Sequence, residues 1–152
     1  MTRMDATRVP PHATDAEEVL LGGLLLQPDK IESVAGELVP EDFYRADHAA
    51  IYRAMLELSG RGQVADAVTL GDYIPDRKAR VYELARDSWS AAGVAGYARM
   101  IRDKALRRRL IDAARGLATA AFGNETDTPA LLADTIGSLM AMQKTESQAE
   151  YT

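Results

Sequence analysis

The chain has 152 residues, of which 47% are hydrophobic and 27% are charged, ordinary values for a globular protein of one-domain size. It has no cysteine, which excludes disulfides and thiolate metal sites, and its net charge of −5 argues against nucleic-acid binding by the whole surface. The longest apolar run, Val19 to Leu26, is too short to span a bilayer and has acidic residues before it. We therefore expect a cytoplasmic protein with no membrane partner.

The first predicted helix follows an arm, residues 1–13, which we expect to be flexible. Thr14-Asp15-Ala16-Glu17 matches a capping box and opens a helix that Pro28 ends. Gly22 and Gly23 interrupt its apolar stripe, and each costs about 1 kcal/mol relative to alanine, so a neighbouring segment should pack closely there. Asp29 is expected to cap a short helix over about 30–37.

Residues 39–56 should form the packing centre of the N-terminal half. Pro40 opens a turn that presents two aromatic side chains, and Asp47 is expected to cap the helix that follows. In that helix His48 shares one face with apolar residues at i+3, i+4 and i+7 spacing. The expected core comprises Leu20, Leu24, Phe43, Tyr44, Ile51, Tyr52 and Met55.

Short elements are predicted between residues 59 and 90. Ser59-Gly60-Arg61-Gly62 is a helix C-terminal signal, and Val64 to Val68 has an extended pattern. Thr69 can cap a short helix that Pro75 closes, and another short helix is expected over Arg77 to Arg86. Ser90 is the expected N-cap of the next helix, and Trp89 beside it is expected to be partly buried.

A long helix is predicted from Ala91 to Phe122, and a second from Thr128-Pro129 to about Gln143. Their apolar residues recur at spacings of three and four, as in a coiled-coil seam, and occupy more than one side of each helix. Since two paired helices bury only their facing sides, we expect the remaining apolar surface to mediate self-association. The residues expected there are Leu106, Leu110, Ile111, Leu117, Leu132, Ile136, Leu139 and Met140.

The predicted fold is therefore all-α, with a compact head of short helices over 14–103 and a two-helix antiparallel hairpin over 104–143. The polar residues 144–152 are expected to be a linker or free tail, which favours a fragment of a longer protein.

Several pieces occur in one order along the chain: Pro10-Pro11-His12, Leu20-Leu21-Gly22-Gly23-Leu24, Val39 to His48, Asp66-x-Val68-Thr69-Leu70, and Tyr97-Ala98-Arg99-x-Ile101-Arg102. In this respect the chain resembles the N-terminal domain of the bacterial replicative DNA helicase, the DnaB family, over residues 9–143. Its Pro-Glu-Asp-Phe-Tyr segment followed by a helix is the most specific of these motifs.

The resemblance implies a collar domain that assembles as a dimer or as a trimer of dimers in a hexameric ring. It also implies docking of primase and of a helicase loader, with DNA contacted only indirectly. The parent protein would unwind DNA with ATP and Mg²⁺, but the chain contains no G-x-x-x-x-G-K-[ST] phosphate loop. We therefore expect no catalytic, cofactor or metal site in it. The segment over residues 71–82 is also shorter than the corresponding segment in the family.

Other interpretations remain open. The chain could be a stand-alone protein, for example phage-encoded, that mimics the collar and binds a host helicase or primase. The basic run Lys104 to Arg109 could instead belong to a DNA-binding helical regulator, although we favour a solvated helix face. His48 is expected to pack or to bond to a carbonyl rather than to act in catalysis, and His12 and His48 do not have metal-ligand spacing.

Overall fold

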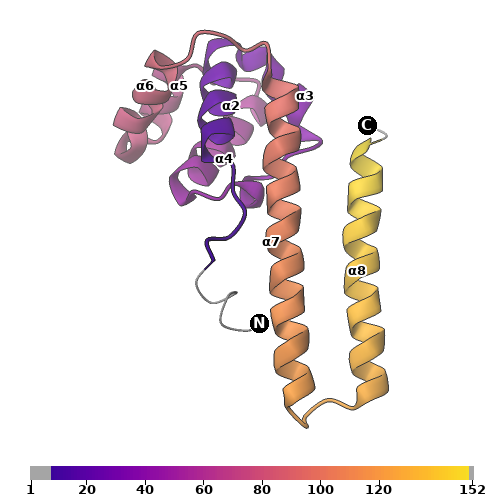
Figure 1. Ribbon diagram of the computed structural model, residues 1–152. Coiled ribbons are helices and arrows are strands. Elements are labelled where there is room, and N and C mark those ends of the chain that lie inside the picture. The colour runs from indigo at the N-terminus through magenta and orange to yellow at the C-terminus, as the bar shows by residue number, and fades with distance from the viewer. Residues whose placement is uncertain (1–7, 151–152) are drawn as a thin grey trace. The chain divides into compact units, whose positions relative to one another are not determined.

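The computed structural model describes residues 8–150, and all of its regular structure in that range is helical (Figure 1). The fold class is therefore all-α, as predicted. Three short 3-10 helices occur at Pro28–Lys30, Pro40–Asp42 and Pro75–Arg77. The α-helices are α2 (Thr14–Leu26), α3 (Ile31–Ala35), α4 (Ala46–Gly60), α5 (Ala67–Tyr73), α6 (Lys78–Arg86), α7 (Val94–Phe122) and α8 (Thr128–Glu150).

The chain divides into two compact units, and α7 contributes to both. We use the name head for the unit His12–Ala105 and the name hairpin for Leu106 onward. Residues 8–11 group with the hairpin, where the Arg108 guanidinium donates a hydrogen bond to the Pro11 carbonyl oxygen at 2.7 Å. Residues 1–7 of the arm that we expected to be flexible lie outside the described residues.

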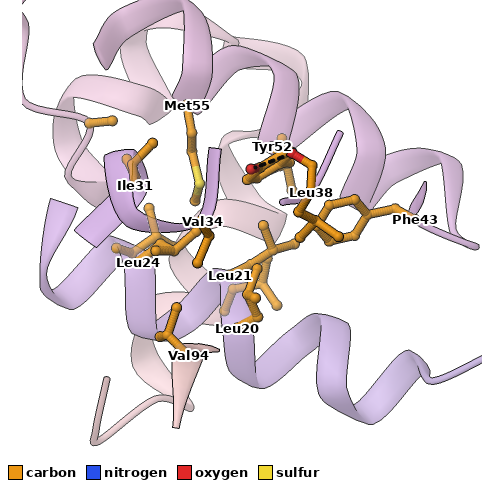
Figure 2. Packing of buried hydrophobic residues seen from close by; sticks show 14 of the residues in the cluster. Leu20, Leu21, Leu24, Ile31, Val34, Leu38, Phe43, Tyr52, Met55 and Val94 are labelled. Carbon is orange, nitrogen blue, oxygen red and sulfur yellow. Dashed lines mark hydrogen bonds between the residues drawn. The ribbon is translucent and has the colours of Figure 1, made fainter. Parts of the chain in front are cut away.

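The core of the head forms around α2, which packs against α4 and α6. Tyr52 of α4 is fully buried, and its hydroxyl donates to the Leu38 carbonyl oxygen at 2.9 Å. Burial, together with the charge of Asp42, raises the pKa of the Tyr52 hydroxyl. Figure 2 shows this bond within a cluster that includes Leu20, Leu21, Leu24, Ile31, Val34, Leu38, Phe43 and Met55.

The two glycines of α2 allow other segments to reach its backbone. A Cβ at Gly22 would lie 2.6 Å from the Ser88 Cβ and 2.8 Å from the Leu84 carbonyl oxygen. A Cβ at Gly23 would lie 3.0 Å from a methyl carbon of Val94. The expected close packing at this pair is confirmed, and it explains why α2 tolerates residues of poor helix propensity.

The predicted caps at the starts of three helices are wrong. Ala13 precedes α2 with no side-chain cap, since Glu17 points into the core instead of closing a capping box. Helix α4 begins at Ala46, so Asp47 lies inside its first turn. Asp66, and not Thr69, caps α5 by accepting from the Thr69 N–H at 2.8 Å.

Three further boundaries differ from the predictions. Val68 is helical rather than extended, and α7 begins at Val94 rather than after Ser90. Helix α8 continues past Gln143 to Glu150, into residues expected to be a tail, because no glycine or proline interrupts it there. The predicted glycine signal after α4 is confirmed by Gly62, whose φ of 75° is the left-handed conformation that ends many helices.

Two aromatic residues lie on the surface, contrary to expectation. Tyr44, expected in the core, is 39% exposed and lies outside the core cluster, with its ring stacked on His12 at a centroid distance of 4.6 Å. Trp89, expected to be partly buried, is 91% exposed. Trp89 lies in the connection between α6 and α7 and is not part of the core cluster of the head.

Gly22→Ala should destabilise the head by about 1–3 kcal/mol, because the new methyl group overlaps backbone and Cβ atoms that cannot move independently. The matched control is Gly60→Ala in α4, where the new Cβ meets no atom within 4 Å and stability should hold or rise slightly. Urea unfolding followed by circular dichroism measures both. Equal stability of the Gly22→Ala variant and the wild type would contradict the close packing described here.

Candidate functional site

The hairpin carries an apolar surface that its own two helices do not bury. Helices α7 and α8 run side by side in opposite directions (Figure 1), and a groove of about 410 Å³ opens between them. Leu110, Leu117 and Leu139 line this groove and remain partly exposed. The hairpin therefore leaves a solvent-facing apolar surface of the kind that marks an interaction site.

The structure brings only some of the predicted hairpin residues to the groove. Leu106 and Ile111 are half-buried, and neither lines the groove. The α8 residues Leu132, Ile136 and Met140 also lie outside the groove lining, yet they are 60%, 56% and 62% exposed. The hairpin thus has apolar residues both inside the groove and beyond it.

A second notable feature is a buried carboxylate in the head. The Glu17 side chain of α2 is 1% exposed. It accepts hydrogen bonds from the Tyr44 N–H at 2.7 Å and the Arg45 N–H at 3.4 Å, both just before α4. Glu17 therefore accepts from backbone N–H groups that precede α4. The predicted capping box had assigned it the same kind of bond at the start of its own helix, α2.

His48 extends this network from α2 and α4 to α6. Its Nδ1 atom lies 2.8 Å from a Glu17 carboxylate oxygen, and its Nε2 atom lies 2.8 Å from the Arg80 guanidinium. A guanidinium can only donate, so Nε2 must accept and the ring proton must reside on Nδ1, facing Glu17. His48 is thus a fully buried residue, as the expectation of packing has it, but its ring nitrogens bond to Glu17 and Arg80 rather than to a carbonyl.

Charged groups surround the outer side of the network. Arg80 forms ion pairs with Glu83 at 2.7 Å, Glu18 at 3.3 Å and Asp47 at 3.6 Å. Burial acts to raise the pKa of the Asp47 carboxyl, but the Arg45 hydrogen bond and the His48 backbone N–H outweigh it and hold that pKa below its usual value. The ionised form of Asp47 is therefore the form that stabilises the head.

Both ring nitrogens of His48 are engaged, one by Glu17 and the other by Arg80. Among residues 8–150, no three His, Cys, Asp or Glu side chains are grouped in a way that could hold a metal ion. Within the same range no helix is both long enough and apolar enough to cross a bilayer.

The sequence interpretation missed Glu17 and Arg80 as network members. A signal for Glu17 was present, because Glu17 lies three and four residues before Leu20 and Leu21 and so falls on the buried face of α2. Arg80 carries no comparable signal for its role in the network, since its partners Glu18, Asp47 and His48 come from α2 and α4, far away in the sequence.

The family model and the similar proteins all belong to one family of replicative DNA helicases. The family model described as the DnaB-like helicase N-terminal domain matches residues 9–103. The replicative DNA helicase DnaC of Bacillus subtilis (strain 168) is 29% identical over 159 residues, and the replicative DNA helicase DnaB of Geobacillus stearothermophilus is 30% identical. In both, the alignment covers 99% of this chain and 35% of the relative, so the chain spans about a third of their length.

Two solved structures share the fold. The crystal structure of the N-terminal domain of DnaB helicase from Mycobacterium tuberculosis matches with a TM-score of 0.80 and 31% identity, over 88% of this chain and 99% of that chain. A structure of the N-terminal domain of DnaB helicase from Helicobacter pylori, described together with its interactions with primase, matches with a TM-score of 0.64 and 21% identity. That match covers 71% of this chain and 90% of the other.

Glu17→Ala should destabilise the head by about 3 kcal/mol, because it leaves the Tyr44 N–H and the His48 ring proton without a buried acceptor. Glu32→Ala, at an exposed acidic residue of α3, is the control and should change stability by less than about 0.5 kcal/mol. The free energy of unfolding of both variants is measured by urea unfolding at neutral pH. A Glu17 variant as stable as the Glu32 variant would exclude the carboxylate as an organising group.

Asp47→Asn should lower stability at neutral pH and lose its effect in acid. Because the folded-state pKa of Asp47 lies below the ordinary 3.8, the stabilisation is present above that ordinary value and disappears as the pH falls through the folded-state pKa. Unfolding midpoints measured between about pH 7 and about pH 2 should therefore converge for the two proteins at the acid end. A difference that stays constant with pH would contradict the assignment.

Proposed function

The chain belongs to the family of DnaB-like helicase N-terminal domains, and on this basis we propose that it is the collar module of a replicative DNA helicase, which assembles subunits through its hairpin. The observation that carries this proposal is the exposed apolar surface on both helices of the hairpin, open as a groove of about 410 Å³. Another copy of the same hairpin would offer an apolar surface of the same kind to cover it, as in a symmetric dimer.

The assembly would be a dimer, or a trimer of dimers within a hexameric ring. Each copy would insert α7 and α8 leucines against the partner's groove, in the manner of a four-helix bundle. A seam that includes Leu110, Leu117 and Leu139 gives each subunit apolar area to bury at the contact. These side chains are 44%, 36% and 44% exposed in the single chain, so each would contribute part of the about 1.5–3 kcal/mol that a fully exposed side chain gains on burial. Self-association would thus complete the core that two helices alone cannot form.

The proposed partners are primase and a helicase loader. Support for primase comes from two matched structures whose descriptions name interactions with primase, one a DnaB-like replicative helicase and the other the Helicobacter pylori domain. Both are under 25% identical to this chain, so they support the fold directly and the partner only by extension. DNA would be contacted only indirectly, through the parent helicase.

The parent protein would unwind DNA with ATP and Mg²⁺ in the cytoplasm, using a motor domain outside the 152 residues. Within the chain we propose no cofactor site, since it has no phosphate loop. The contribution of this module would be to hold subunits together and to present docking surfaces, while the energy of unwinding would come from nucleotide hydrolysis elsewhere.

Leu110→Asp should abolish self-association while leaving the fold intact. Leu110 is 44% exposed in the single chain, so a carboxylate there stays hydrated in the monomer, but in the proposed interface it would be buried without a partner at a cost of several kcal/mol. Sedimentation equilibrium measures the assembly, and circular dichroism checks the helix content.

The matched control is Val68→Asp, which places the same charge at an exposed apolar residue of the head. That variant should associate as the wild type does. An unchanged oligomer in Leu110→Asp, or an equal loss in both variants, would exclude the hairpin groove as the interface.

A further inference from the structure

The most exposed large apolar side chain of the head is Trp89, in the connection between α6 and α7. Tryptophan is the residue that most often anchors protein interfaces, and an isolated solvent-facing indole contributes nothing to the head's own core. Its 91% exposure therefore needs an explanation other than stability.

Trp89 sits on a fixed segment of backbone. Ser88 packs on the Gly22 backbone of α2, and its N–H bonds to the Ala85 carbonyl oxygen at 3.3 Å. On the other side of Trp89, the Lys30 ammonium donates to the Ala91 carbonyl oxygen at 3.1 Å. Because both flanks are held, the indole is presented at a defined place, and binding would cost little ordering of the backbone.

Beside Trp89 the head has a cavity of about 370 Å³ that lies between α2, α6 and the start of α7. Its apolar wall includes Val19 of α2, Leu84 of α6 and Tyr97 of α7. Val19 is itself 42% exposed although it lies in the middle of α2. The cavity and the indole together form an apolar surface large enough to accept one or two aliphatic side chains.

The polar lining of this cavity is predominantly acidic. Glu18 and Asp87 belong to it, and both are partly exposed. Its one cation, Arg80, is already shared among Glu18, Asp47 and Glu83, so it has little charge left to offer an anionic ligand. Three carboxylates share Arg80, so negative charge is in excess around it, whereas Asp87 is paired with Arg86 at 3.1 Å. An incoming lysine or arginine would meet this excess negative charge and the face of the Trp89 ring, where cation–π attraction adds to the ionic one.

We propose that the Trp89 surface, defined as Glu18, Val19, Leu84, Asp87, Trp89 and Tyr97, docks a lysine- or arginine-rich amphipathic segment of a partner protein. Aliphatic side chains of that segment enter the cavity, and a cationic side chain lies on the indole between the two acids. The surface is made entirely of head residues and does not use the hairpin, so it is separate from the proposed self-association.

The test uses the full chain and a short synthetic amphipathic helix of leucine and lysine carrying a fluorescent label. Binding is followed by anisotropy, and also by the emission of Trp89, which is the single tryptophan of the chain. We expect saturable binding that weakens with salt and a change in Trp89 emission, with no binding of a matched peptide that has glutamate in place of lysine.

Trp89→Ala should weaken lysine-peptide binding about tenfold, and Asp87→Asn about threefold. Two control variants keep the test specific: Val68→Ala alters an exposed apolar residue outside the surface, and Leu110→Asp alters the hairpin groove. Both controls should bind the peptide as the wild type does.

Equal binding by Trp89→Ala and the wild type, or equal binding of the lysine and glutamate peptides, would overturn the proposal. Binding lost in Leu110→Asp but kept in Trp89→Ala would place the peptide on the hairpin and also overturn it. None of these results bears on the oligomer, whose own test is the mass of the Leu110→Asp variant, so the two proposals can fail separately.

Discussion

The head depends on one buried carboxylate. Glu17 of α2 accepts the backbone N–H groups that precede α4 and the ring proton of His48, which in turn accepts from Arg80 of α6. Three helices distant in sequence are thus bonded through one chain of polar atoms. Apolar packing alone is tolerant of small shifts, whereas a buried acceptor with fixed donors permits one arrangement, because any displacement leaves a polar atom unsatisfied.

Close packing at Gly22 is a second interaction that holds α6 against α2. The absence of a side chain at Gly22 lets α6 and Ser88 reach the α2 backbone, and the Arg80 ion pairs hold the first turn of the same helix. Together they fix the connection that carries Trp89. The indole is therefore presented at a defined place on the surface of the head.

The amino-acid sequence predicts most of the architecture but less of the polar detail. Apolar periodicity located every long helix, and the costly glycine pair in α2 predicted a close neighbour, because both are local properties of the chain. Glu17 was misassigned because its local pattern also fits a capping box, and only the tertiary contacts with Tyr44 and His48 decide between the two roles. Trp89 was also misplaced, because whether a side chain next to a helix start is buried depends on tertiary contacts, and it is 91% exposed.

The central claim is that the hairpin needs a second copy to cover its apolar surface. The most direct test is the mass of the unmodified chain in solution, measured by light scattering over a wide range of concentrations at moderate salt. We expect a mass that rises with protein concentration to the mass of two or more chains of 16.5 kDa each. A mass of one chain at every concentration would contradict it and would mean that the hairpin remains stable with its apolar surface in water.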